Sequence, residues 1–330
     1  GLVGSEMCIR DSVEAVAANQ FAAIGGEGSV TITGGVINAA GKNNAAGIGS
    51  NGDIRITGGE ITVSAEGLGA AIGGYAGVDC GNITIQGNVI KSVISSGAGA
   101  CIGGASNRSA GSITISNAKL PPLNGTSLIG WIRGNTAGSL TIRNCYIEST
   151  DTAAGSGIQV SDNGNIRIEN SEVKLPEKRD IRAGDGGSIV IRDSTIHSNG
   201  IYMLGNLNEA KSLKRLEITG STVVTAGNVI GAMGSRASVD EIVIHGSSLS
   251  PAEGADHYYA IGGGEYASFG SIDIQGSQIN IPLASNGAAI GGGNYATYSG
   301  ESTIRIANSQ VTAATGARLS AAIGTGNGSQ

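Results

Sequence analysis

The sequence predicts an all-β protein, a right-handed parallel β-helix of about 11–12 coils with three short strands in each coil. Three observations predict this solenoid. A short Ile-x-Ile strand recurs along the chain, and the same kind of turn residue follows every copy. In addition, the 330 residues include 57 Gly but only 3% aromatic residues. Each repeat is too small to bury a core alone, so repeats must stack, and parallel crossovers are overwhelmingly right-handed.

The first element of each repeat is a three-residue strand with apolar outer positions. Its eleven copies are spaced 23 to 32 residues apart, at 30–32, 54–56, 83–85, 113–115, 140–142, 166–168, 189–191, 216–218, 242–244, 272–274 and 304–306. Successive side chains of a strand point to opposite faces, so the outer residues should point inward. The middle residues are expected outside: Thr31, Arg55, Thr84, Thr114, Thr141, Arg167, Val190, Glu217, Val243, Asp273 and Arg305.

A turn residue follows each first strand at a constant distance. It is always Gly, Asn or Asp, the types that tolerate positive φ. The eleven residues are Gly34, Gly58, Gly87, Asn117, Asn144, Asn170, Asp193, Gly220, Gly246, Gly276 and Asn308. We therefore expect a bend with a left-handed residue to end each first strand. Asn117, Asn144 and Asn170 follow three successive first strands, and we expect a ladder of side-chain amides there.

A second apolar stretch follows the bend, as at Ile61 and Val63, and "AAIG" or a variant forms the third element. The third element is predicted around Ile24, Ile48, Ile72, Ile102, Ile129, Ile230, Ile261, Ile290 and Ile323. The glycines of "AAIGGG" are predicted to form a tight corner, where a side chain would clash with the neighbouring coil. A phosphate-binding loop is not indicated, because neither a helix nor a Lys-Ser/Thr pair follows.

The repeats define the domain organisation. Residues 21–330 are predicted to form a single β-helix domain, and residues 1–20 are a non-repeat segment. Within that segment, residues 1–12 resemble translated sequencing-adapter read-through. The chain stops partway through a repeat, so we expect a C-terminally truncated piece of a longer protein. The signal peptide, the anchor and further domains would then belong to the parent chain.

Composition excludes several classes of function. The net charge of −6 provides no basic footprint for nucleic acid, and no apolar run is long enough to span a membrane. The four cysteines lack metal-site spacing and are interpreted as unpaired, with Cys101 a small core residue. The sequence indicates neither a cofactor nor a metal site.

The repeats "AAIGGG", "GSIDIQGSQI" and "GDIRITGGEITVSA" resemble the Gly-rich β-helical repeats of large bacterial surface proteins within the pectin-lyase-like superfamily, common in Firmicutes. The resemblance covers roughly residues 21–330. It implies an extracellular or cell-surface location and a role as an adhesin-type stalk or a carbohydrate-associated module. Polysaccharide lyases and glycoside hydrolases share this fold, so the resemblance does not decide activity.

Catalysis on this fold would need carboxylates that converge on an outer face. Glu217 and Asp273 share the predicted outer row but lie two coils apart, roughly 9–10 Å. The three histidines, His197, His245 and His257, are scattered. The charged stretch 170–194 is interpreted as a solvated face, and 208–217 as a short helical insertion. No catalytic residue is assigned.

The aromatic residues are the better functional indication. Six of the eleven are candidate glycan-binding residues near the C-terminus: Tyr258, Tyr259, Tyr266, Phe269, Tyr295 and Tyr298. Tyr75, Tyr266 and Tyr295 each follow a Gly corner, and Tyr266 and Tyr295 are expected to stack one coil apart. Exposed rings can stack on sugars or anchor a protein partner. The alternative is that they pack a loop onto its own coil.

We therefore predict a non-catalytic bacterial cell-surface β-helix module, either an adhesin-type stalk or a glycan-binding region of a larger protein. Its candidate partner is a polysaccharide or a host surface glycan. Two alternatives remain open at this point. One is a polysaccharide lyase or glycoside hydrolase, which a groove with clustered carboxylates would favour. The other is a structural spacer, which a featureless surface would favour.

Overall fold

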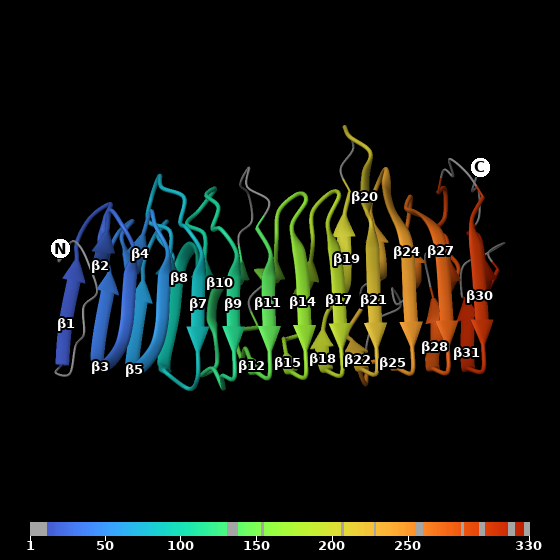
Figure 1. Cartoon of the computed structure of the whole chain (residues 1–330). Coiled ribbons are helices and arrows are strands. Elements are labelled where there is room, and N and C mark those ends of the chain that lie inside the picture. Colours follow the sequence, from blue (N-terminus) through green and yellow to red (C-terminus); the bar gives the residue numbers. More distant parts are fainter. Residues whose placement is uncertain are drawn as a thin grey trace. The chain divides into compact units, whose positions relative to one another are not determined.

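The computed structural model describes residues 12–130, 138–152, 155–205, 208–227, 229–254, 260–284, 287–296, 301–315 and 321–326. The regular structure in these ranges consists of β-strands without a helix, and the strands of the coils pair in parallel (Figure 1). The chain divides into two units, Gly1–Ser161 with Asn170–Pro176, and Asp162–Glu169 with Glu177–Gln330. The predicted parallel solenoid is confirmed within each unit.

The first unit contains two long series of parallel strands, blue to green in Figure 1. First strands pair in the order β3-β5-β7-β9-β11, and third strands in the order β2-β4-β6-β8-β10-β13. The second strand of the later coils is represented by the pair β12–β15. The strands are β1 (Ser12–Ala17), β2 (Ala22–Gly26), β3 (Val30–Gly41), β4 (Ala46–Ser50), β5 (Ile54–Ala65), β6 (Ile72–Gly73), β7 (Ile83–Gln86), β8 (Ile90–Gly103), β9 (Ile113–Ser116), β10 (Asn124–Gly130), β11 (Leu140–Arg143), β12 (Tyr146–Glu148), β13 (Gly155–Gln159) and β15 (Glu172–Lys174).

The second unit contains three parallel series, one for each strand of the coil. They run β14-β17-β21-β24-β27-β30, β18-β22-β25-β28-β31 and β16-β19-β23-β26-β29-β32. The strands are β14 (Asn165–Glu169), β16 (Arg179–Arg182), β17 (Ser188–Arg192), β18 (Thr195–Ser198), β19 (Ile201–Leu204), β20 (Lys211–Leu213), β21 (Arg215–Thr219), β22 (Thr222–Thr225), β23 (Ile230–Met233), β24 (Ala237–His245), β25 (Ser248–Pro251), β26 (Ile261–Gly263), β27 (Ser268–Gln275), β28 (Gln278–Ala284), β29 (Ile290–Gly291), β30 (Thr303–Ala307), β31 (Gln310–Thr315) and β32 (Ile323–Gly324).

An aliphatic column forms the core of each unit. All eleven predicted triplets lie within strands. Their inward residues stand opposite one another on adjacent coils, as Ile54 does with Ile83 and Ile242 with Ile272, and these four side chains are buried. Each fully buried Ile contributes about 1.5–3 kcal/mol relative to an exposed one. In-register stacking of β-branched residues therefore provides the main stabilisation of the coils.

Third strands occur in more coils than the "AAIG" pattern identified. Ile158 pairs with Ile129 in the first unit, and in the second unit Ile201 pairs with both Ile181 and Ile230. The "AAIG" motif is absent around Ile158, Ile181 and Ile201, so the sequence pattern did not predict their strands. The segment 208–217 is also corrected, because it is not helical. Within it, Lys211–Leu213 form β20 and residues 215–217 begin β21, and β20 pairs with Ala237–Val239 of β24.

Nine of the eleven predicted turn residues have positive φ: Gly87, Asn117, Asn144, Asn170, Asp193, Gly220, Gly246, Gly276 and Asn308. The prediction is wrong by one residue at Gly34 and Gly58. The left-handed residues there are Gly35, with φ 85°, and Gly59, with φ 90°. In these two coils β3 and β5 continue through the bend with a register shift, and the second glycine of each Gly-Gly pair absorbs it.

The glycines after the third-strand Ile are required by close approach of neighbouring coils. A Cβ on Gly262 would lie 2.0 Å from the carbonyl oxygen of Gly291, and one on Gly73 would lie 1.8 Å from that of Gly103. Both glycines also have φ above 120°, a conformation that L residues rarely adopt. The predicted tight corner is therefore present at these positions.

A serine ladder lies inside the bend of the second unit. Each serine directly follows a turn residue, and its hydroxyl accepts a hydrogen bond from the backbone N–H of the serine one coil earlier. The donor–acceptor distances are 3.1 Å for Ser194 to Ser221, 3.2 Å for Ser221 to Ser247, 3.2 Å for Ser247 to Ser277 and 3.1 Å for Ser277 to Ser309. The ladder satisfies backbone donors that are buried away from water.

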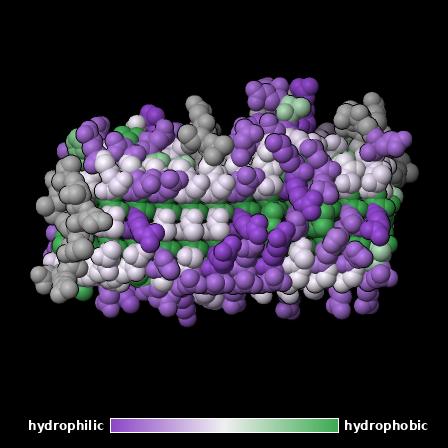
Figure 2. Space-filling model, viewed as in Figure 1, coloured by the Kyte–Doolittle hydropathy of each residue, from purple (hydrophilic) through white to green (hydrophobic). Residues whose placement is uncertain are grey.

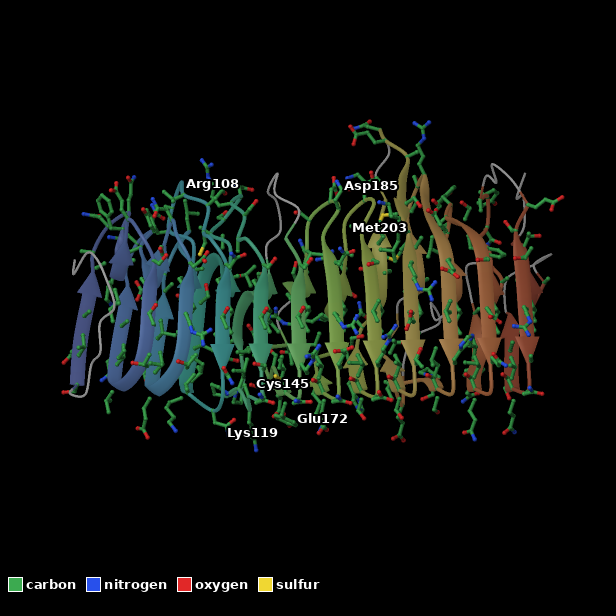
Figure 3. All side chains as sticks on the ribbon, in the orientation of Figure 1. Arg108, Lys119, Cys145, Glu172, Asp185 and Met203 are labelled. Atoms are coloured by element: carbon green, nitrogen blue, oxygen red, sulfur yellow. The ribbon has the colours of Figure 1, made fainter. Side chains whose placement is uncertain are left out.

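The corresponding bend of the first unit carries an amide contact and a cysteine. The Asn144 side-chain amide donates to Oδ1 of Asn117 at 2.9 Å, which provides one step of the expected ladder. Cys145, labelled in Figure 3, occupies the position of the ladder serines. Its thiol donates to the carbonyl of Arg143 at 3.1 Å. Cys80, Cys101 and Cys145 are buried and not disulfide-bonded, whereas Cys8 lies outside the described residues.

Candidate functional site

Tyr266 and Tyr295 form an exposed aromatic pair on the second unit. Tyr266 follows β26 and Tyr295 follows β29, so the two side chains leave equivalent turns of adjacent coils. Their ring centroids lie 5.5 Å apart with an interplanar angle of 22°, a stacked arrangement. The residues remain 46% and 52% exposed. Two rings stacked on each other with half their surface in water form a surface that a flat ligand can contact.

The backbone at this pair is unusual for tyrosine. Tyr266 has φ 60° and Tyr295 has φ 58°. Ala267 N–H donates to the Gly264 carbonyl at 2.9 Å, so Tyr266 is the third residue of a tight turn. A third position with positive φ is ordinarily Gly or Asn, and a left-handed conformation costs a non-glycine residue roughly 1–2 kcal/mol.

Four other coils place the usual residue types at this turn position, five residues after the third-strand Ile: Gly77, Asn107, Asn163 and Gly186, with φ between 58° and 83°. The coil before Tyr266 has Arg236 at the third position of the equivalent turn, with φ 56°. Tyrosine in the same conformation is therefore a departure from the local rule, and such departures concentrate at functional sites.

Two of the other aromatic residues singled out in the sequence lie in the core and do not join this surface. Phe269 lies in β27 with its ring buried, so it is corrected to a core residue. Tyr75 is also buried and packs with Ala22 and Ala46. When residues are counted from the third-strand Ile of each coil, Tyr75 occupies the position of Gly264 and not that of Tyr266. The predicted equivalence of Tyr75 with Tyr266 and Tyr295 is therefore wrong. Tyr258, Tyr259 and Tyr298 lie outside the described residues.

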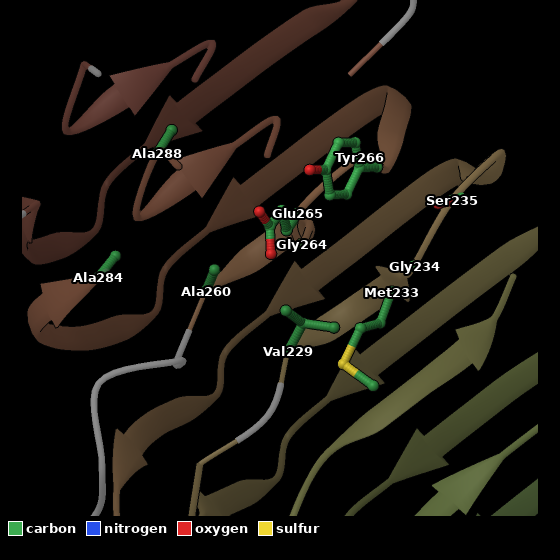
Figure 4. Close-up of a pocket in the computed structure, with 10 residues that line it drawn as sticks. All are labelled: Val229, Met233, Gly234, Ser235, Ala260, Gly264, Glu265, Tyr266, Ala284 and Ala288. Carbon is green, nitrogen blue, oxygen red and sulfur yellow. The ribbon is translucent and has the colours of Figure 1, made fainter. Parts of the chain in front are cut away.

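An apolar hollow of about 300 Å³ lies against Tyr266 (Figure 4). Its lining comes from the third-strand regions of successive coils and from the end of β28: Val229, Met233, Gly234, Ser235, Ala260, Gly264, Glu265, Tyr266, Ala284 and Ala288. Val229 and Ala260 pack on the buried ring of Tyr202, which supports the hollow from the core. The hollow is thus apolar on most sides and carries one carboxylate.

The floor of this hollow rests on a buried polar cluster that sequence reasoning missed. The Tyr202 hydroxyl donates to Oδ2 of Asp180 at 2.8 Å, and the Asn199 amide donates to Oδ1 at 3.0 Å. Burial, followed by the nearby Asp180 carboxylate, raises the pKa of Tyr202 well above its ordinary value. Tyr202 therefore stays protonated and acts as a rigid donor beneath the hollow.

A second hollow, of about 550 Å³, lies on the other side of the tyrosine pair. Both tyrosines line it, together with Arg236 and small residues: Ala210, Ser235, Ala237, Ser238 and Ser268. Tyr266 and Ser235 line both hollows. Tyr266 and Ser235 therefore lie between an apolar hollow and a more polar one that Arg236 also lines.

The carboxylates of the first-strand face are engaged in ion pairs. Figure 2 shows hydrophilic side chains gathered over β14, β17 and β21. Glu217 Oε1 lies 2.6 Å from the Arg192 guanidinium and Oε2 lies 3.1 Å from that of Arg215. Asp273 pairs with Arg305 and lies within hydrogen-bonding distance of the His245 ring, each at 3.3 Å. Glu217 points outward as predicted but is buried, because these two guanidinium groups cover it.

The pKa of Glu217 reflects this environment. Burial pushes the pKa upward, but hydrogen bonds and charge from Arg192 and Arg215 outweigh burial and hold it below its ordinary value. Glu217 is therefore ionised at neutral pH and unsuited to donate a proton to a leaving group. Val243, which precedes Asp273 in the same outward row, is also buried rather than exposed.

Within the ranges that the structure describes, no three His, Cys, Asp or Glu side chains come together in an arrangement that could hold a metal ion. A search of the same residues for a helix long and apolar enough to cross a membrane also finds none.

A family model described as a right-handed beta helix region matches residues 74–249, just over half of the chain. No curated protein and no solved structure matches the chain. The match agrees with the parallel coils and in-register isoleucines of both units, and it supplies the right-handed sense of the coils. The chain belongs to the family of proteins with a right-handed beta helix region.

Proposed function

We propose that this chain is a non-catalytic glycan-binding module whose site is the stacked pair Tyr266–Tyr295 and the two hollows beside it. The observation that carries the proposal is the pair's conformation. Two adjacent coils hold exposed tyrosines at positive φ where four other coils have Gly or Asn. A turn that served only to reverse the chain would gain nothing from tyrosine, whereas exposed rings supply a stacking surface for the apolar face of a sugar.

The hollows on either side explain how such a ligand could be oriented. A sugar ring that contacts the tyrosine edges would reach Ser235, Ser238 and Ser268 in the larger hollow, where hydroxyl groups can exchange hydrogen bonds with sugar hydroxyls. Arg236 supplies further donors in that hollow. Binding sites commonly combine an apolar or aromatic platform with a few polar groups that fix orientation.

Two observations make the enzyme alternative less favourable. Glu217 is held ionised by two arginines, and Asp273 is paired with a histidine and an arginine. A hydrolase would need one carboxyl group that stays protonated and a second one facing it across a groove. We therefore place binding above polysaccharide lyase or hydrolase activity for this chain.

The proposal includes an extracellular or cell-surface setting, as an adhesin-type stalk or a glycan-binding region of a larger bacterial protein. Its support is the resemblance of the Gly-rich coils to bacterial surface repeats, together with an exposed aromatic pair suited to polysaccharides or host surface glycans. A chain with net charge −6 would not be drawn to anionic nucleic acid.

The test is a glycan array probed with the full chain and with the double variant Tyr266→Asn, Tyr295→Asn. Asparagine occupies the same turn position at Asn107 and Asn163 with φ of 58° and 59°, so the variant removes the rings while keeping the backbone. Phe21→Asn is the matched control, because Phe21 is an exposed aromatic residue, 68% exposed, of the first unit.

We expect the wild type and Phe21→Asn to bind the same glycans and the tyrosine variant to lose them. Binding that survives in the tyrosine variant would place the site elsewhere. If no glycan is retained by the wild type, the glycan-binding proposal fails and the structural-spacer alternative gains support.

A further inference from the structure

We propose that the glycan bound by this module carries a primary ammonium group, and that the apolar hollow beside Tyr266 receives this group with Glu265 as its counter-ion. This inference rests on the proposed glycan-binding function. It adds the chemical class of the ligand, an amino sugar with a free amine.

Among the residues that the structure describes, one charged side chain lines the hollow. Of its ten lining residues, Glu265 alone is ionisable to a charged form at neutral pH, and the others are aliphatic, aromatic, glycine or serine. In the view of Figure 4 the Glu265 carboxylate lies between the ring of Tyr266 and the methyl group of Ala260. A ligand group in this space would therefore meet a negative charge, an aromatic ring and hydrocarbon walls.

Glu265 differs from the carboxylates on the first-strand face of the second unit. Glu217 and Glu241 pair with arginines, and Asp273 pairs with Arg305 and His245. In the part of the chain that the structure describes, Glu265 forms neither an ion pair nor a side-chain hydrogen bond. A partly buried carboxylate without a cation leaves electrostatic energy to be gained from a cationic ligand.

The neighbouring groups favour an ammonium over other sugar substituents. A cation is attracted both by a carboxylate and by the face of a tyrosine ring. Val229, Met233 and Ala260 line the hollow with hydrocarbon, and charge–charge attraction is stronger beside such groups than in bulk water. A carboxylate substituent, as in a uronic acid, would be repelled by Glu265, and the chain's net charge of −6 acts in the same direction.

The two hollows then have different roles. Arg236 lines the larger hollow and is absent from the lining of the smaller one. Because Arg236 would repel an ammonium group, the amine is directed to the Glu265 side of the tyrosine pair. The sugar hydroxyls then face the serines and Arg236 on the other side.

The experiment compares three β-1,4-linked hexasaccharides that differ only at carbon 2 of each sugar: glucosamine with an amine, N-acetylglucosamine with an acetamide, and glucose with a hydroxyl. Dissociation constants are measured by calorimetry for the full wild-type chain, for Glu265→Gln and for Glu253→Gln. Glu253 is an exposed carboxylate outside the hollow, so its variant makes the same change in net charge away from the site.

We expect the wild type to bind the glucosamine hexamer about tenfold or more tightly than the glucose hexamer, because a charge-assisted hydrogen bond replaces a neutral one. Glu265→Gln should remove this preference and leave glucose binding unchanged, while Glu253→Gln should preserve it. Raising the salt concentration should weaken glucosamine binding in the wild type and have little effect in Glu265→Gln.

Equal binding of the three hexamers, a preference for the acetamide or the hydroxyl, or a glucosamine preference that survives Glu265→Gln would each overturn the inference. If the array shows binding to glycans without an amine and none of the three hexamers binds, the ammonium inference fails while the glycan-binding function stands. A lysine-containing peptide that binds through Glu265 when no saccharide binds would overturn both and indicate a protein partner.

Discussion

The backbone N–H of Ser221 donates a hydrogen bond to the hydroxyl of Ser247 on the next coil, at 3.2 Å. The same hydroxyl donates to the carbonyl of His245, two residues earlier, at 2.8 Å. Ser247 thus connects two coils and closes the bend of its own coil. Both serines are buried, so water cannot substitute for these contacts.

This relationship predicts the cost of removing one hydroxyl. Ser247→Ala leaves the Ser221 N–H without its acceptor in a buried bend, and we expect a loss of about 1–3 kcal/mol in the free energy of unfolding. Ser250→Ala is the control, since Ser250 lies on the outward face of β25 and should change stability by less than about 0.5 kcal/mol. Urea denaturation of the full chain measures both, and equal effects would contradict a structural role for the ladder.

Substitutions at two glycines distinguish the energetic cost of a steric clash between coils from the cost of a left-handed backbone conformation. Gly262→Ala places a Cβ against the Gly291 carbonyl at a rare φ of 121°, and we expect a cost of about 3–5 kcal/mol or failure to fold. Gly276 has φ 58°, and a Cβ added there would meet no atom within 4 Å, so Gly276→Ala should cost only about 1–2 kcal/mol. Denaturation midpoints in the opposite order would refute the proposed coil-to-coil contact.

The ion pairs of Glu217 with Arg192 and Arg215 predict that the stability of the fold depends on pH. The pKa of Glu217 is lower in the folded chain than its ordinary value, so the folded state binds fewer protons than the unfolded state. The ionised Glu217 side chain therefore stabilises the fold fully at pH values above the unfolded pKa of about 4.3. That stabilisation is lost as the pH falls through the folded pKa. We expect Glu217→Gln to be less stable than the wild type by about 1–2 kcal/mol at pH 7.

The difference between wild type and Glu217→Gln should shrink as the pH falls below about 4. Unfolding free energies of both proteins at pH 7 and pH 3 provide the measurement. A difference that stays constant across this range would mean that the Glu217 charge does not stabilise the fold.

The buried cysteines predict slow thiol chemistry. Burial, with a smaller contribution from the Asp53 carboxylate, raises the pKa of Cys80 to about 12. At pH 8 the thiolate fraction is then on the order of one in 10,000, compared with about a quarter for a free cysteine. We expect iodoacetamide to label Cys80 in the unfolded chain but not in the native chain, with peptide mass spectrometry as the readout. Rapid native labelling would show that its surroundings open easily.

The tyrosine conformation predicts a rank order of substitutions. Tyr295→Asn should be more stable than Tyr295→Ala by about 1 kcal/mol, because both lose the stacking contact but Asn adopts positive φ more readily. Thermal unfolding of the two variants provides the comparison. If alanine is equal or better, the left-handed turn imposes no strain at this position.

Much of the fold was predictable because one signal repeats. An Ile triplet with a Gly, Asn or Asp behind it specifies a strand and its bend from local residues alone, and all eleven triplets lie in strands. The serine ladder also corresponds to a recurring sequence pattern, since serine directly follows the turn residue in five coils of the second unit. The third strands at Ile158, Ile181 and Ile201 had no such signal, because a single Ile does not define a strand.

The candidate site was harder to predict because it depends on register between coils. Tyr75 and Tyr266 both follow a Gly corner, yet a displacement of two residues buries one ring and exposes the other. Similarly, the environment of Glu217 comes from Arg192 on the preceding coil and Arg215 on its own coil. The sequence shows the three residues, but only the pairing of β17 with β21 shows that their charges meet.

The turn that holds Tyr266 and Tyr295 also has an evolutionary consequence. Asparagine and tyrosine codons differ by one base, and both residues occupy this turn with nearly the same φ. A point mutation can therefore add a ring to a coil, or remove one, without rerouting the backbone. Under the proposed glycan-binding function, ligand preference can then diversify coil by coil among descendants of one solenoid while the isoleucine column stays unchanged.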